Sequence, residues 1–269
     1  MGTFDVAHPD VKDFIRAKRE DGRLRQFNLS LLITDGFMQA VETDADWPLV
    51  FPINEKERGD IDVDDPEQVV WREWPSHATY IGREDGLVAC RIYGHIRARH
   101  LWDMIMVSTY DYAEPGFILI DKVNEMNNNW WCESIRATNP CGEQPLPSYG
   151  CCCLGSIDLT RFVQRPFETD AAFDDAGFAA LARTAVRMLD NVLDISLWPL
   201  PQQHDEAMSK RRIGLGFTGL GDALVMLGLR YDTEAARVKA AQIAQSMRDA
   251  AYDASADLAA ERGAFPLFN

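Results

Sequence analysis

Strand-like segments alternate with helix-like segments along the chain, and this order constrains the fold most. Residues 27–33 form an apolar run typical of a strand, and Thr34 or Asp35 can cap a short helix after it. The same succession recurs as a strand at 87–93 and a helix near 96–110. Repeated strand-then-helix units predict an α/β protein.

Apolar periodicity predicts further elements at both ends of the chain. A helix is expected near 9–20 and a strand at 116–120. Three more helices are expected near 171–195, 219–228 and 233–262, the last ending at Gly263. The C-terminal part is therefore predicted to be mainly helical.

The stretch 43–76 is rich in Asp, Glu and Pro, with three Trp residues interspersed. We interpret it as an acidic surface insertion packed by its own aromatic side chains rather than as a regular element. Residues 60–65 imitate the start of a calcium loop, but Asp65 stands where a Gly is needed and Trp71 where a bidentate Glu is needed. A solvated acidic loop fits better.

Charge and hydropathy exclude several classes of protein. The 269 residues are 46% hydrophobic and carry a formal net charge of −15, which argues against broad binding to nucleic acid or to an anionic membrane. No window approaches the length of a membrane span, and the first residues do not resemble a signal peptide. These observations predict a globular cytoplasmic protein.

The six cysteines suggest redox or catalytic chemistry because they cluster unevenly. They are Cys90, Cys132, Cys141 and the adjacent Cys151, Cys152 and Cys153. Their spacing does not match structural zinc, and all five His lie outside the cysteine-rich region, so no metal site is predicted.

Residues 121–155 are polar and rich in Asn and Pro, as functional loops are. Within them, Asn139, Cys141 and Glu143 stand two residues apart, so that an extended loop would project all three to one side. The neighbouring prolines stiffen the backbone. A thiol active-site loop and a rigid turn with a buried Cys both explain this pattern.

The run Cys151–Cys153 supports the first interpretation. In a strand, Cys152 would lie on the face opposite Cys151 and Cys153, so one thiol could line a site while two pack. Three buried small residues remain the alternative.

Glycines at 214, 216 and 219 fit a dinucleotide-binding fingerprint, with Asp232 at a plausible distance for a ribose contact. However, residues 208–212 are charged where the fingerprint needs a strand. Tight strand-to-helix packing by glycine is the better explanation, and an NAD-dependent oxidoreductase using Gly214–Gly219 stays as an alternative.

Two longer segments, 137–146 and 149–159, closely resemble the catalytic subunits of ribonucleotide reductases. The resemblance extends to residues 8–10, 27–28, 112–116, 211–216 and 219–222, and so covers nearly the whole chain. It implies that residues 1–269 form part of a single ten-stranded α/β barrel with a central finger loop, incomplete at both ends.

The resemblance also implies roles for individual residues. Cys141 would lie at the tip of the finger loop and, as a thiyl radical, abstract the ribose 3′ hydrogen. Glu143 would take the 3′-hydroxyl proton, and Asn139 would hold that hydroxyl. Pro140 and Gly142 complete the expected substrate-binding segment.

Cys152 matches one of the two family thiols that supply reducing equivalents and close into a disulfide. Its partner belongs on a strand before residue 1, and neither Cys90 nor Cys132 matches it. The effector-binding region and a phosphate-binding loop are also expected outside the chain. We therefore expect the chain alone not to turn over.

The motif Asn-Pro-Cys-Gly-Glu-Gln-Pro at 139–145 resembles that of the adenosylcobalamin-dependent class of ribonucleotide reductases. This implies adenosylcobalamin as cofactor, a ribonucleoside diphosphate reductase activity, nucleotide effectors, a thioredoxin-like reductant and a homodimer as partners. The sequence itself does not decide between diphosphate and triphosphate substrates, and it identifies no cobalamin-binding residue.

A non-catalytic interaction fragment is the other alternative, and it predicts no convergent site around Asn139, Cys141 and Glu143. The reductase hypothesis predicts that the Cys141 and Cys152 sulfurs lie on either side of one sugar ring, about 5 to 8 Å apart.

Overall fold

The computed structural model describes residues 1–19, 24, 26–59, 61–74 and 79–268. The chain divides into two compact units, Met1–Ser148 and Tyr149–Asn269, which we describe separately. In the described parts of the chain, no helix combines the length and the apolar character needed to cross a membrane.

Unit 1 is built on a parallel sheet of β1 (Gly2–Asp5), β2 (Leu29–Ile33) and β6 (Gly116–Leu119), in the order β1-β2-β6. The central strand β2 is almost fully buried, as parallel strands between covered faces are. The strands expected at 27–33 and 116–120 are confirmed, although β2 begins two residues later than the apolar run.

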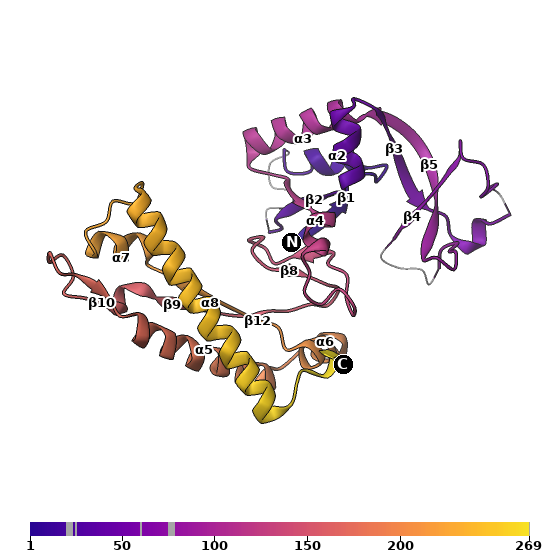
Figure 1. The fold of residues 1–269 in the computed structure, drawn as a ribbon. Helices are drawn as coiled ribbons and strands as arrows, with labels where there is room; N and C mark the ends of the chain where they lie inside the picture. The colour runs from indigo at the N-terminus through magenta and orange to yellow at the C-terminus, as the bar shows by residue number, and fades with distance from the viewer. Residues whose placement is uncertain (20–23, 25, 60, 75–78, 269) are drawn as a thin grey trace. The chain divides into compact units, whose positions relative to one another are not determined.

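Helices α1 (Val11–Arg16), α2 (Asp35–Glu42) and α3 (Ala98–Tyr112) contribute apolar side chains to the core of this unit, and α4 (Ile120–Glu125) follows β6 (Figure 1). Thr34 caps α2 as expected, because its hydroxyl accepts a hydrogen bond from the Phe37 N–H at 3.2 Å. The helix expected near 9–20 is shorter, since α1 ends at Arg16.

The prediction of an irregular insertion at 43–76 is wrong for much of this stretch. The strands β3 (Asp46–Pro52) and β4 (Val69–Glu73) flank β5 (Leu87–Arg97) in an antiparallel sheet, with the short helix η1 (Glu55–Glu57) between them. Trp47 packs its ring 5.2 Å from Phe37 of α2, so β3 belongs to the unit's core. The apolar side chains of β3 and β4 pair with those of β5, and this pairing stabilises the two strands despite the acidic composition of the stretch.

The calcium-like segment begins at residue 60, which lies outside the described residues. Two of its carboxylates are used in local turns. Asp62 accepts from the Asp64 N–H at 3.0 Å, and Asp65 accepts from the Glu67 N–H at 2.9 Å. These Asx turns fit the solvated acidic loop that we expected.

Unit 2 is a parallel pair of strands covered by two long helices. The strands are β9 (Cys153–Asp158) and β12 (Ile213–Thr218), and Figure 1 shows α5 (Asp175–Ile195) and α8 (Glu234–Arg262) side by side along them. Their core includes a cluster of three Phe rings, among which Phe178 is fully buried.

Smaller elements complete unit 2. They are η2 (Leu159–Phe162), the hairpin strands β10 (Val163–Gln164) and β11 (Ala172–Phe173), α6 (Pro201–Lys210), α7 (Leu220–Met226) and η3 (Pro266–Phe268). The expected C-terminal helices are confirmed as α5, α7 and α8. Helix α5 begins at residue 175 because residues 172–173 pair with β10 and the Asp174 carboxylate caps the helix.

Within the described residues the strands form five short sheets, and none closes into a barrel. The α/β class predicted from the alternation of elements is confirmed.

Candidate active site

The loop that carries Asn139, Cys141 and Glu143 joins two very short antiparallel strands. These are β7 (Ala137–Thr138) and β8 (Pro145–Leu146), paired as Ala137 with Leu146 and Thr138 with Pro145. The Asn139 N–H also donates to the Gln144 carbonyl at 3.0 Å, which continues the pairing into the loop. The loop therefore has a fixed base.

Cys141 lies at the tip of this loop. The Gly142 N–H donates to the Asn139 carbonyl at 3.0 Å, which closes a turn with Pro140 and Cys141 at its centre. Pro140 presets the backbone for the turn, and Gly142 adopts φ +87°, a left-handed conformation that other residues rarely take. The thiol side chain is exposed. The exposed thiol fits a thiol active-site loop better than a rigid turn with a buried Cys, although the backbone forms a turn here rather than the extended loop that we considered.

The Asn139 and Glu143 side chains meet across the turn. Asn139 Nδ2 donates to Glu143 Oε1 at 2.5 Å, while Asn139 Oδ1 accepts from the Gln144 N–H at 3.0 Å. Both ends of the amide are thus fixed, and the carboxylate is held on the same side as the amide. The structure brings these two predicted residues together around Cys141.

Asn28, just before β2, anchors the loop to the body of unit 1. Its Nδ2 donates to the Pro140 carbonyl at 2.5 Å, and its own carbonyl accepts from the Gly2 N–H at 2.7 Å. The loop tip therefore lies beside the amino ends of β1 and β2. Sequence reasoning gave Asn28 no role, because a contact across 112 residues leaves no local pattern.

The three adjacent cysteines differ from the prediction in their backbone. Only Cys153 belongs to β9, whereas Cys151 and Cys152 precede the strand, so the expected strand alternation does not apply to them. All three are half-buried. Burial raises the pKa of the Cys151 thiol, with the Glu206 carboxylate adding to the rise, and burial also raises the pKa of Cys153.

The other two cysteines sit in different surroundings. Cys90 is buried in β5, and burial raises its pKa to about 12, as for an inert core thiol. Cys132 is half-buried, and its thiol donates to the Asn129 carbonyl. These contacts support packing roles for both.

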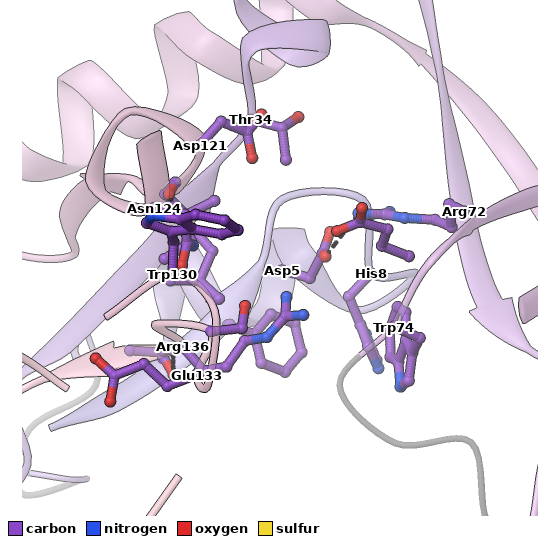
Figure 2. A pocket seen from close by; sticks show the side chains of 16 residues that line it. Asp5, His8, Thr34, Arg72, Trp74, Asp121, Asn124, Trp130, Glu133 and Arg136 are labelled. Carbon is purple, nitrogen blue, oxygen red and sulfur yellow. Dashed lines mark hydrogen bonds and ion pairs between the residues drawn. The ribbon is translucent and has the colours of Figure 1, made fainter. Parts of the chain in front are cut away.

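A cavity of about 570 Å³ opens in unit 1 at the carboxyl ends of β1, β2 and β6 (Figure 2). Asp5, Thr34 and Asp121 line it from the strand ends. Ligands of α/β proteins commonly bind at this edge of a parallel sheet. Sequence reasoning missed this cavity, because β1 was not predicted, although Thr34 and Asp121 follow the two strands that were predicted and gave a signal.

The cavity wall combines ion pairs with aromatic rings. Arg72 donates to Asp5 Oδ2 at 2.8 Å, and the ring centroids of His8 and Phe4, which both line the cavity, lie 4.4 Å apart. His8 Nδ1 accepts from the Asp10 N–H at 3.0 Å, and burial lowers the pKa of its imidazole, which favours the neutral ring. None of the described lining residues belongs to the loop 139–144.

The glycines at 214 and 216 lie inside β12 rather than in a loop between a strand and a helix. A phosphate would therefore find no glycine-rich turn there. Gly219, at φ +73°, is where glycine is needed, because a Cβ would lie 3.0 Å from Asp158 Oδ1 and 3.1 Å from Thr160 Cγ2. Close packing is the explanation that the sequence favoured.

A family model for the barrel domain of ribonucleotide reductases matches residues 1–269. The chain belongs to this family. Among its relatives are vitamin B12-dependent ribonucleoside-diphosphate reductases from Mycobacterium tuberculosis and Thermoplasma acidophilum, which are 36% and 32% identical to it over 269 residues, the whole of this chain. The ribonucleoside-diphosphate reductase subunit alpha of Synechocystis is 30% identical over 277 residues, which cover 98% of this chain.

This ribonucleotide reductase barrel chain spans about a third of the length of the curated relatives it matches: 33%, 30% and 33% of the three named above. The resemblance seen in the sequence is confirmed at the level of the family. The match to a reductase barrel over every residue does not favour either alternative, the NAD-dependent oxidoreductase or the non-catalytic fragment.

Proposed function

We propose that the protein to which this chain belongs reduces ribonucleotides to 2′-deoxyribonucleotides by a thiyl-radical mechanism, with Cys141 as the radical-bearing residue. The observation that carries this proposal is the hydrogen bond between Asn139 and Glu143 across the Cys141 turn. It places a proton acceptor and an amide beside one exposed thiol, as chemistry on a sugar carbon and its hydroxyl requires.

In the proposed reaction, the Cys141 sulfur abstracts the hydrogen atom on ribose C3′. Glu143 accepts the proton of the 3′-hydroxyl, and Asn139 holds that hydroxyl by a hydrogen bond. Only one oxygen of the Glu143 carboxylate is engaged with Asn139, and within the described residues no donor occupies the other. That second oxygen is the one we assign to the substrate hydroxyl.

We propose Cys152 as one of the two thiols that supply electrons. The 2′-hydroxyl leaves as water, and two cysteine thiols close into a disulfide as they give up two electrons and two protons. An external dithiol protein of the thioredoxin type then restores the thiols. Nucleotide effectors, a homodimer and work in the cytoplasm also belong to this proposal.

Adenosylcobalamin is the cofactor that we propose, because the relatives from M. tuberculosis and T. acidophilum are named vitamin B12-dependent. When bound, it would supply the radical that generates the Cys141 thiyl. The described cavity of unit 1, at about 570 Å³, is of a size for a drug-sized molecule, and a whole corrinoid is larger. This cavity does not fit the cofactor, so we assign it no cobalamin contact.

The proposal is tested in the full-length protein by measuring deoxyribonucleotide formation. Cys141→Ser should abolish turnover, and Glu143→Gln should lower kcat on the order of 100- to 10,000-fold, the usual contribution of a general base. Cys152→Ser should block repeated turnover. Cys132→Ser, outside the loop, should retain activity. Repeated turnover by the Cys141→Ser protein at the wild-type rate would overturn the proposal.

A further inference from the structure

The turn at residues 139–142 is tied to the sheet of unit 1 through Asn28. The hydrogen bond from the Gly142 N–H to the Asn139 carbonyl closes the turn but fixes only its own shape. Among the described residues outside the loop and its two strands, only Asn28 forms a hydrogen bond with the turn, from its Nδ2 to the Pro140 carbonyl at 2.5 Å. This contact therefore sets where the turn lies.

The backbone of Asn28 is itself fixed by the parallel sheet. The Asn28 carbonyl accepts from the Gly2 N–H at 2.7 Å, and the next residue, Leu29, pairs in register with Gly2. A carbonyl oxygen can only accept, so the Asn28 amide has to present its NH₂ group to Pro140. The side chain is short, and it therefore transfers the position of the sheet to the turn.

The Pro140 carbonyl belongs to the central peptide of the turn, which can take two orientations. Type I and type II turns differ in the direction of this peptide, and type II requires a positive φ at the third residue, here Cys141. Gly142 has a positive φ, whereas Cys141 does not, as in type I. Because the peptide unit is planar, the direction of the Pro140 carbonyl also fixes the backbone nitrogen of Cys141.

We propose that Asn28 is a positioning residue that holds this turn in its type I form and thereby directs the Cys141 sulfur toward the substrate sugar. This inference rests on the proposed function and extends it to a residue outside the loop. A flipped central peptide would turn the Pro140 carbonyl away from Asn28 and change the direction of the Cys141 side chain. The Asn28 hydrogen bond is made only in the orientation that the structure shows.

The step that depends on this position is the hydrogen-atom transfer from ribose C3′ to the Cys141 thiyl radical. An S–H bond forms as the C3′–H bond breaks, and the unpaired electron passes to C3′. A misplacement of the reacting atoms by about 1 Å can lower such a rate on the order of 100-fold. Asn28 acts on this step through the backbone of the turn, without contacting the sugar.

The test compares Asn28 variants of the full-length protein, using a ribonucleoside diphosphate that carries deuterium at C3′. Asn28→Asp keeps the shape of the side chain but places an acceptor against the Pro140 carbonyl. It should lower kcat roughly 10- to 100-fold and leave KM nearly unchanged. The deuterium isotope effect on kcat should increase, because hydrogen transfer then limits the rate more strongly. Asn28→Gln retains the NH₂ group and should restore part of kcat.

Hydrogen exchange measures the turn itself and needs no turnover. In Asn28→Asp the Gly142 N–H should exchange roughly 2- to 10-fold faster, the usual effect of one lost hydrogen bond, while exchange in β2 stays unchanged. Asn28 is exposed, so the substitution opens no cavity. Gln26→Glu is the matched control, because Gln26 is also exposed and the change adds the same charge two residues earlier. It should retain the wild-type kcat and exchange rate.

A lower kcat with a larger isotope effect and faster Gly142 exchange would support the proposal. A raised KM at unchanged kcat, an equal loss in Asn28→Asp and Asn28→Gln, or the same loss in Gln26→Glu would overturn it. Asn28→Ala is the second variant, and wild-type kcat there would also overturn it. Unchanged Gly142 exchange in Asn28→Asp would reject this inference alone, whereas turnover by the Cys141→Ser protein would reject the proposed function.

Discussion

The loop at 139–144, which we propose is catalytic, and the cysteine run at 151–153 both present thiols, but the surroundings of these thiols differ. Cys141 is exposed on a turn that backbone and amide hydrogen bonds hold rigidly. The cysteines of the run are half-buried, and burial raises the pKa values of the Cys151 and Cys153 thiols. Hydrogen-atom transfer depends on where a sulfur sits, whereas disulfide exchange depends on how readily it ionises.

The largest expected effect would test whether the two regions belong to separately stable units. Phe178 is fully buried in the core of unit 2, so Phe178→Ala should lower the free energy of unfolding of this unit by about 3–5 kcal/mol. Hydrogen exchange should show lost protection in α5 and β9 and unchanged protection in β2.

Tyr252→Ala, at a side chain that is 66% exposed on α8, is the control and should change stability by less than about 0.5 kcal/mol. Equal loss of protection in β2 after Phe178→Ala would mean that the catalytic loop and the cysteine run share one cooperative unit. The two regions could then not be treated as parts of separately stable units.

A smaller effect tests what makes the loop 139–144 rigid. Gly142 has φ +87° and open space around its Cα, so Gly142→Ala should cost about 1–2 kcal/mol through backbone strain alone. Faster hydrogen exchange at the Gln144 N–H, which donates to Asn139, would report the loosened turn.

Gly36→Ala provides a control of opposite sign. Gly36 lies in α2 with open space around it, and alanine there should stabilise the protein by up to about 1 kcal/mol. If both alanine variants had the same effect, strain at residue 142 would not be what makes the loop rigid.

The smallest effect concerns the attachment of α6 to α5, where Arg211 donates to Asp190 Oδ1 at 2.7 Å and to Asp194 Oδ1 at 2.8 Å. The Arg211 hydrogen bond lowers the pKa of Asp194, so this pair stabilises the fold above the ordinary Asp pKa of 3.8, and the stabilisation is lost as pH falls through the lowered folded value. Because Asp194 is 49% exposed, Asp194→Asn should cost less than about 1 kcal/mol at neutral pH.

Urea unfolding of the Asp194→Asn and wild-type proteins over a pH series measures this difference. It should shrink toward zero as pH drops below 3.8. A difference that persisted at acid pH would assign the effect to packing rather than to charge.

Local signals predicted the elements that local chemistry determines. The Thr34 cap, the glycine after α8 and the apolar run of β2 could all be recognised within a few residues. Pro201 at the first position of α6 carried the same kind of signal, and sequence reasoning overlooked it. Strands β3 and β4 were missed because their stability comes from pairing with β5, which follows them by many residues.

The residues of the candidate site also differ in whether the local sequence could predict them. Asn139, Cys141 and Glu143 could be predicted because they share one turn, whose Pro and Gly restrict the backbone. The contact of Asn28 and the cavity at the strand ends could not, because each depends on residues that only the fold brings together.

The central claim is that the Cys141 and Cys152 thiols serve one substrate sugar from opposite sides. A crystal structure of the full-length protein with a bound ribonucleoside diphosphate would test it most directly. We expect the two sulfurs to lie about 5 to 8 Å apart, two van der Waals contacts, with the ribose between them and Glu143 facing its 3′-hydroxyl. Sulfurs much farther apart, or a Glu143 carboxylate turned away from the sugar, would contradict it.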